Sequence, residues 1–153
     1  MGQKLTFREA TEQDVERIVE MLADDELGRK RERFEIPLPS SYIKAFREIE
    51  KDPNNELVVA CYKDKVVGVL QITFTPYITY QGGWRATVEG VRIASEVRGK
   101  GVGSKMIEWA IHRAKERGCH LIQLTTDKQR EDALRFYERM GFQPTHEGMK
   151  LKL

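Results

Sequence analysis

Cysteine and proline are scarce in this sequence, and long apolar runs are missing. Its 153 residues include 2 cysteines and 5 prolines. No hydrophobic stretch approaches the roughly 18 to 20 residues that cross a bilayer, and the first residues lack the apolar core of a secretory signal, so we expect no membrane partner. Cys61 and Cys119 each lie in an apolar, strand-like run. This placement favours two buried free thiols over a disulfide or a metal pair and predicts a cytoplasmic protein.

Charge of one sign is not in excess either. The chain has 26 lysines and arginines against 24 aspartates and glutamates, which gives a formal net charge of +2. Proteins that neutralise many phosphates of a polynucleotide are far more basic, so we expect no nucleic-acid partner. His112, His120 and His146 have no ligand spacing with one another or with the cysteines, and we assign no metal site. The size and composition predict one globular domain over residues 1–153.

The hydrophobic period changes along the chain and divides it into helices and strands. A period near 3.6 predicts helices that begin at Thr11, where Asp14 completes a capping box, and at Ser40 or Ser41, which would cap the second helix. The other predicted helices are 101–117 and 129–140, and a period of two predicts strands at 5–8, 57–62, 66–75, 84–94, 120–126 and 148–153. The stretch 24–35 mixes charges of both signs and is expected to be a solvated loop. Short turns favour antiparallel pairing and strand–helix–strand units favour parallel pairing, so a mixed sheet covered by helices on both faces follows.

One predicted strand runs through a glycine-rich turn straight into a helix. At a helix start the first backbone N–H groups have no partner within the helix, and the helix dipole places partial positive charge there, so a phosphate is a natural ligand. Gly99, Gly101 and Gly103 leave these amides open to an anion, while Arg98 and Lys100 add positive charge. A diphosphate fits this description.

Two well-known glycine motifs and a plain connecting turn fit these residues less well. A Walker A loop needs four residues between its first glycine and Gly-Lys-Ser/Thr, and here the residue orders Lys100-Gly101 and Ser104-Lys105 are the wrong ones. A dinucleotide fingerprint that begins at Gly99 has Ser104 in place of its third glycine. A turn that only joins a strand to a helix needs neither three alternate glycines nor two flanking cations. Anion binding is therefore the favoured interpretation.

Two motifs resemble the GNAT superfamily of N-acetyltransferases. Arg98–Gly103 is similar to the acetyl-CoA loop of that family, Arg/Gln-x-x-Gly-x-Gly/Ala, and Ala133–Phe142 is similar to its late helix, A-x-x-F-Y-x-x-x-G-F. The motifs lie in the family's order about thirty residues apart, and the resemblance covers nearly all residues from Leu5 onward. It implies a GNAT-like α/β fold with a mixed, mainly antiparallel central sheet of about six to seven strands and helices on both faces.

The resemblance also implies a reaction, in which an acetyl group passes from acetyl-CoA as co-substrate to an amine by direct attack. In the family a tyrosine at the position of Tyr137 lies near the coenzyme sulfur and acts as general acid. Family members often carry a carboxylate at the place of Glu89 or of Thr87 that accepts the amine proton through water, and here only Glu89 is an acid. Without a proton role, Tyr137 would be a core aromatic beside Phe136, and Glu89 would be a solvent-facing or substrate-orienting carboxylate.

Strand and loop would share the contacts with the coenzyme. Gly90 is expected to form a bulge that opens the sheet, where the pantetheine arm would add itself as a pseudo-strand along Val91, Arg92 and Ile93. The remaining expected coenzyme contacts are Arg98, Gly99, Lys100, Gly101, Val102, Gly103 and Ser104. Arg130 departs from the asparagine that the family frequently has at this position.

The acceptor is expected to be a small-molecule amine or a peptide amino group. The family builds its acceptor cleft from the first two helices and the hairpin loops, here residues 27–42 and 77–84. Acids at 24–26 would favour a cationic amine. Aromatic side chains of these segments would line a pocket, or belong to the core or to a dimer contact: Phe34, Tyr42, Tyr77, Tyr80 and Trp84. Family habit suggests a homodimer, and the alternative to an enzyme is a non-catalytic acyl-CoA-binding or regulatory module of the same fold.

Overall fold

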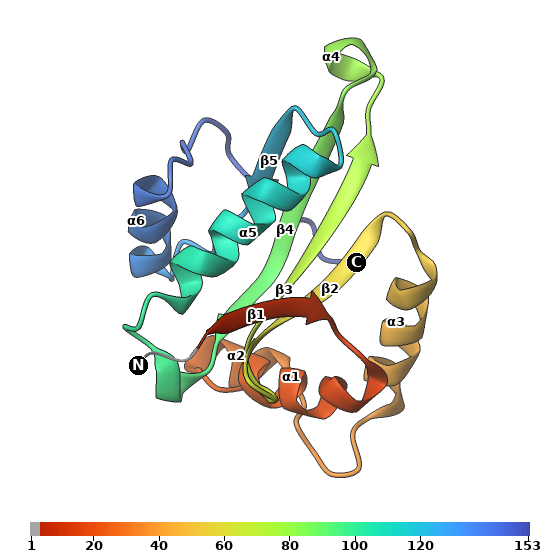
Figure 1. The fold of residues 1–153 in the computed structure, drawn as a ribbon, viewed down its shortest axis with the longest axis vertical. Coiled ribbons are helices and arrows are strands. Elements are labelled where there is room, and N and C mark those ends of the chain that lie inside the picture. The colour runs from red at the N-terminus through yellow and green to blue at the C-terminus, as the bar shows by residue number, and fades with distance from the viewer. Residues whose placement is uncertain (1–3) are drawn as a thin grey trace.

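The fold is described from a computed structural model, which covers residues 4–153 (Figure 1). The strands are β1 (Leu5–Glu9), β2 (Asn55–Tyr62), β3 (Lys65–Pro76), β4 (Trp84–Ile93) and β5 (Leu121–Leu124). The helices are α1 (Val15–Leu22), α2 (Glu26–Arg31), α3 (Ser40–Lys51), α4 (Thr79–Gly82), α5 (Val102–Glu116) and α6 (Glu131–Arg139). Short 3-10 turns at Glu12–Asp14 and Ser95–Val97 precede α1 and the loop before α5. Within residues 4–153 no helix has the length and apolar character of a membrane span.

The sheet has the order β1-β2-β3-β4-β5. The first three pairings are antiparallel and the last is parallel, so the predicted mixed, mainly antiparallel sheet is confirmed. The predicted number of strands is wrong, because residues 4–153 form a sheet of 5 strands and not one of six to seven. The sixth strand expected from the alternation over 148–153 does not form, since these residues pair with no strand of the described chain.

Helices cover both faces of the sheet, as predicted. A Cβ on Gly68 of β3 would meet Met106 of α5 at 2.5 Å. The next position, Val69, pairs with Arg92 of β4, whose guanidinium reaches the carbonyl of Met21 at the end of α1 at 3.5 Å. Because neighbouring positions of a strand point to opposite faces, α5 lies on one face and α1 on the other.

β4 has a bulge opposite Leu70 of β3. Val69 pairs with Arg92 and Gln71 pairs with Glu89, so Leu70 alone stands opposite two residues of β4. One of the two is Gly90, whose φ of 61° lies in the left-handed region that glycine adopts without strain. The bulge predicted at Gly90 is thus present, and it bends β4 at the place where the pairing with β5 ends.

The 3-10 turn Glu12–Asp14, which leads directly into α1, begins with the predicted capping box of Thr11 and Asp14. The buried carboxylate of Asp14 accepts hydrogen bonds from Thr11 N–H at 2.7 Å and from Arg8 Nη1 and Nη2 at 2.7 and 3.1 Å. The bonds from Arg8 hold the pKa of Asp14 below its usual range although burial opposes them, and the bond from Thr11 adds to this. The lowered pKa means that the ionised form stabilises the fold.

Replacing Asp14 by Asn is expected to lower the free energy of unfolding at pH 7 by about 2 kcal/mol, since a buried group loses charge-assisted hydrogen bonds. The stabilisation by Asp14 is complete above the carboxyl's unfolded pKa and is lost as the pH falls through its lowered folded pKa, so D14N should flatten that part of the pH profile. Urea unfolding at several pH values measures both effects. E12Q is the matched control, because Glu12 makes an exposed ion pair with Arg47 and its loss should change the stability by less than about 0.5 kcal/mol. Equal losses in the two variants would contradict the role given to Asp14.

Two local predictions about the α1–α3 region are wrong. The charged stretch 24–35 is not a plain solvated loop, because it contains α2, whose N-cap Asp25 accepts a hydrogen bond from Gly28 N–H at 2.5 Å. Neither Ser40 nor Ser41 caps α3, since the N-cap is Pro39 and makes no side-chain bond. Proline suits this place because its missing N–H has no partner to lose at a helix start.

Candidate active site

The loop between β4 and α5 presents a row of unpaired backbone N–H groups. Gly101 is the N-cap of α5 with a φ of 78°, and Gly99 has a φ of 79°, so both adopt the left-handed conformation. A Cβ at either glycine would meet no atom within 4 Å, which leaves the space in front of the loop open. The amides that find no protein acceptor within residues 4–153 are those of Gly99, Gly101, Val102, Gly103 and Ser104. Together with the dipole of α5, these donors suit an anion with several oxygens.

Positive side chains flank this row of amides. Arg98 and Lys100 are exposed and form no ion pair with residues 4–153, so their charges are available to a ligand. The side chain of Val102 is buried in the core, and only its backbone faces the loop. The residues predicted to hold a diphosphate are therefore adjacent. The backbone N–H groups of Arg98 and Lys100 bond to the carbonyls of Ser95 and Val97, so these two residues offer their side chains, and the other five offer their amides.

The edge of β4 beyond Val88 has room for a further extended chain. β5 pairs with β4 only over 85–88, whereas β4 continues to Ile93. Within the described chain no strand pairs with this second half of β4 on the β5 side. Val91 and Ile93 are half-buried there, and Ile93 lies 3.9 Å from the Cβ position of Gly103, so the open edge leads directly to the loop.

Tyr137 lies on α6, which packs beside the start of α5. Its neighbour Phe136 comes within 3.4 Å of the Cβ position of Gly103. The half-buried Tyr137 ring is packed edge-on between Phe136 at 5.1 Å and Phe142 at 5.8 Å between ring centroids. Its hydroxyl bonds to no group of residues 4–153 and is not sealed in the interior. Burial of the ring raises the pKa of Tyr137, against the opposing charge of Arg130.

Glu89 and Thr87 point to the face of the sheet opposite α5. Glu89 is exposed and pairs across the strands with Gln71. The Thr87 hydroxyl accepts a hydrogen bond from Gln123 Nε2 of β5 at 3.2 Å. Both residues follow the alternation predicted from the sequence, and Glu89 is the carboxylate beside the bulge.

A cluster that the sequence did not predict joins Arg92, Asp25 and Arg130. Asp25 Oδ2 lies 3.0 Å from Arg92 Nη1 and accepts a hydrogen bond from Arg130 Nη1 at 2.7 Å. Burial would raise the pKa of Asp25, but the bond from Gly28 and the two arginines outweigh it, so that pKa lies below its usual range. Burial lowers the pKa of Arg92, while Asp25 opposes this change. The cluster carries two positive charges against one negative charge.

This cluster cannot be predicted from the order of residues along the chain. Asp25 and Arg130 are separated by 105 positions, and the strand alternation of β4 gives only the face on which Arg92 lies. Arg92 was expected beside the coenzyme, and its side chain instead turns toward α1 and α2, which leaves its backbone at the open edge. Asp25 was also expected to attract a cationic amine. Its carboxylate is not free for this, because two arginines already hold it.

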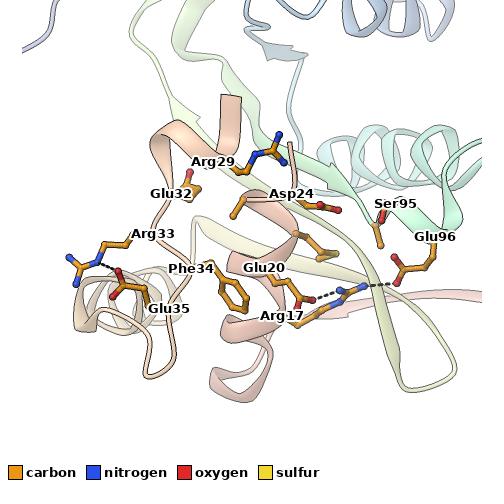
Figure 2. A pocket seen from close by; sticks show the side chains of 13 residues that line it. Arg17, Glu20, Asp24, Arg29, Glu32, Arg33, Phe34, Glu35, Ser95 and Glu96 are labelled. Carbon is orange, nitrogen blue, oxygen red and sulfur yellow. Dashed lines mark hydrogen bonds and ion pairs between the residues drawn. The ribbon is translucent and has the colours of Figure 1, made fainter. Parts of the chain in front are cut away.

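A groove of about 750 Å³ lies between α1, the segment that follows α2, and the end of β4 (Figure 2). Arg17 lines the groove and donates hydrogen bonds to two glutamates of its lining. One goes to Glu20, and the other runs from Arg17 Nη2 to Glu96 Oε1 at 2.7 Å. Phe34 lines the groove, whereas Tyr77 and Tyr80 flank Arg85 near the protruding tip of the β3–β4 hairpin (Figure 1). The aromatic residues considered for an acceptor pocket thus do not form a single pocket.

Comparisons with known proteins agree with this arrangement. The sequence profile of the Acetyltransferase (GNAT) family matches residues 16–142. A crystal structure from Bacillus halodurans C-125, described as a transcriptional regulator, is 67% identical, with a TM-score of 0.95 and coverage of 98% of this chain and 100% of that chain. Aminoalkylphosphonate N-acetyltransferase of Salmonella typhimurium (strain LT2) is 30% identical over 62% of this chain and 61% of its own length. Glucosamine 6-phosphate N-acetyltransferase of Trypanosoma brucei brucei is 28% identical over 58% of each chain.

The chain belongs to the Acetyltransferase (GNAT) family. This match confirms the predicted family. The predicted enzyme class and the predicted co-substrate, acetyl-CoA, agree with it. The chain spans less than two thirds of the length of the Salmonella typhimurium and Trypanosoma brucei brucei relatives.

Proposed function

We propose that this protein transfers an acetyl group from acetyl-CoA to a primary amine while both substrates are bound. The observation that carries the proposal is the set of unpaired amides of Gly99, Gly101, Val102, Gly103 and Ser104, next to the open edge of β4. The loop is suited to the diphosphate of the coenzyme, with Arg98 and Lys100 as its charged partners. The backbone from Val91 to Ile93 supplies hydrogen-bonding groups for the amides of the pantetheine arm.

The chemistry needs one group to accept a proton and another to donate one. The amine nitrogen forms a bond to the thioester carbon, the carbon–sulfur bond breaks, and the sulfur leaves with the electron pair of that bond. We assign the proton of the amine to Glu89 through a water molecule, and the proton of the departing thiol to Tyr137. The raised pKa of Tyr137 keeps its hydroxyl protonated, as a general acid requires.

The acceptor class that the site favours is a small amine that also carries an anionic group, such as a phosphonate or a phosphate. Arg92 and Arg130 share one carboxylate, so the cluster retains a net positive charge. Arg92 lies on the same sheet face as Glu89, three positions along β4, or about 10 Å at most. Two of the four N-acetyltransferase relatives, those of Salmonella typhimurium and Trypanosoma brucei brucei, are named for amines with a phosphonate or phosphate group.

A panel of matched amines tests both parts of the proposal, with thiol release as the signal. An aminoalkylphosphonate should be acetylated with a KM about 10-fold below that of the neutral alkylamine of equal length, because an arginine–phosphonate contact is charge-assisted. Arg130→Gln should remove this preference and leave the KM of the neutral amine unchanged. Lys128→Gln, which removes a nearby exposed charge, is the control. Equal KM values for the paired amines would reject the anionic acceptor, and no thiol release with any amine would reject the enzyme.

A second candidate function is an acyl-CoA-binding or regulatory module, which the description of the Bacillus halodurans relative as a transcriptional regulator favours. Such a module keeps the loop and the β4 edge but has no need of an acid at position 137. Calorimetry separates the two, because the module would bind acetyl-CoA as tightly in Tyr137→Phe and release no thiol in either form.

A further inference from the structure

Arg85 is the only charged residue between Lys65 and Glu89, the part of the chain that forms most of the β3–β4 hairpin. It is the second residue of β4, which begins beside the protruding tip α4 in Figure 1. Its cross-strand neighbours, Thr75 and Leu121, are uncharged. No ion pair of the described chain includes Arg85, and its buried Nε has no hydrogen-bond partner there. The structure therefore contains a cation without a counter-ion.

Two tyrosine rings enclose the guanidinium of Arg85. Its central carbon lies 4.6 Å from the ring centroid of Tyr77 and 5.0 Å from that of Tyr80. Both contacts use the rings and not the hydroxyls, so they cover the two flat faces of the guanidinium. The N–H donors lie in its plane, where an anion with two oxygens binds them side by side. The enclosure thus leaves Arg85 suited to a carboxylate that approaches in this plane.

The turn that positions Tyr80 is strained. Tyr80 and Gln81 have φ values of 52° and 60°, the left-handed region that residues with a side chain rarely adopt. The ring of His120 stacks on Tyr80 at 5.4 Å between centroids and holds it there. A turn that only joined two strands would place Asn or Gly at such positions. A strained turn and a buried donor without a partner both cost free energy, and costs of this kind gather at ligand sites.

Arg85 lies on the sheet face that carries the proposed base. Arg85, Thr87 and Glu89 alternate along β4, so all three side chains point away from α5. Four strand positions separate Arg85 from Glu89, which corresponds to about 13 Å. The face between them is lined by half-buried hydroxyl and amide side chains, namely Gln71, Thr73, Thr75, Thr87 and Gln123. A polar chain could lie along this strip, with one end at each charged residue.

We propose that Arg85 binds the carboxylate at the far end of an elongated acceptor whose amine lies at Glu89. A chain of about three amino acids has the required form, because it spans about 10 Å and has an amine at one end and a carboxylate at the other. Arg92 lies on the opposite side of Glu89 along β4, so its cluster binds an anion close to the amine, and Arg85 binds a distant one. The placement of the amine rests on the proposed acetyl transfer, whereas carboxylate binding at Arg85 does not.

A titration followed by NMR tests the carboxylate site without any activity assay. The Nε–H signal of Arg85, identified by its absence in Arg85→Gln, should shift and saturate with triglycine. Triglycinamide, which differs only in its neutral far end, should bind at least about 10-fold more weakly, because it lacks the charge-assisted contact. Equal affinities, or no shift with triglycine, would overturn the site. Acetate that binds as tightly as triglycine would show a site for any carboxylate and overturn its link to the acceptor.

Steady-state kinetics test the link to the reaction, with thiol release as the signal. The KM of triglycine should be about 10-fold below that of triglycinamide in the wild type. Arg85→Gln should make the two KM values equal and leave that of triglycinamide within about 2-fold, which also shows that the variant is folded. Arg47→Gln, which removes an exposed arginine paired with Glu12, is the matched control and should keep the wild-type ratio.

The outcomes separate the two proposals. An Arg85→Gln protein that keeps the 10-fold preference for triglycine would overturn the role of Arg85 in acceptor binding. If no amine releases thiol, the proposed acetyl transfer fails, and the wild-type titration still decides whether Arg85 binds the carboxylate.

Discussion

Tyr137→Phe is expected to lower kcat by about 100-fold or more, because general acid catalysis typically contributes 10²- to 10⁴-fold. The ring packs between Phe136 and Phe142, and these contacts do not involve the hydroxyl, so the variant keeps the packing of α6. The dissociation constant for acetyl-CoA should stay within about 2-fold, since binding is assigned to the loop and the β4 edge. Steady-state kinetics and calorimetry measure the two quantities separately.

The pH dependence gives this prediction a second readout. The acid must be protonated to act, and burial raises the pKa of Tyr137, so activity should persist up to the ordinary tyrosine pKa of about 10 and fall only above it. Tyr137→Phe should lack this fall at high pH. Tyr80→Phe removes the hydroxyl of an exposed tyrosine at the hairpin tip and should leave kcat unchanged. Loss of coenzyme affinity in Tyr137→Phe without loss of kcat would mean that the residue only supports binding.

Local patterns predicted the parts of the fold that depend on neighbours in sequence. The capping box at Thr11, the bulge at Gly90 and the helix that begins after Gly101 each require particular residue types within a few positions, and all three are present. The loop was predictable for the same reason, because an anion site at a helix start is built from consecutive amides. The chemistry assigned to Tyr137 and Glu89 stays a prediction.

Features that depend on distant partners could not be predicted in this way. The cluster of Asp25, Arg92 and Arg130 joins three separate elements, and charge patterns along the chain contain no information on such a meeting. The pattern of 148–153 predicted a strand, and the structure of the single chain has no strand there. A period of two predicts a strand with one apolar side, but it does not show whether a neighbouring strand is in place for those residues to pair with. Both errors arise from the same limit of local patterns.

Removing the two cations of the loop together, Arg98→Ala with Lys100→Ala, is expected to raise the dissociation constant for acetyl-CoA about 30-fold. Each exposed charge facing a phosphate contributes on the order of 1 kcal/mol, and 1.4 kcal/mol corresponds to a factor of ten. The effect should shrink at high salt, because exposed charges are screened. Lys44→Ala with Lys115→Ala removes two exposed positive charges elsewhere and should leave the affinity unchanged.

An acetyl donor that lacks the diphosphate tests whether the loop acts on that group. S-acetylpantetheine carries the thioester and the arm but no diphosphate, so the Arg98/Lys100 double variant should use it as well as the wild type does. Gly101→Ala should weaken acetyl-CoA binding as well, because a side chain at a φ of 78° costs about 1–2 kcal/mol and its Cβ would enter the open space before the amides. If the double variant lost acetyl-CoA and S-acetylpantetheine equally, the loop would be supporting the fold of the site and not holding the diphosphate.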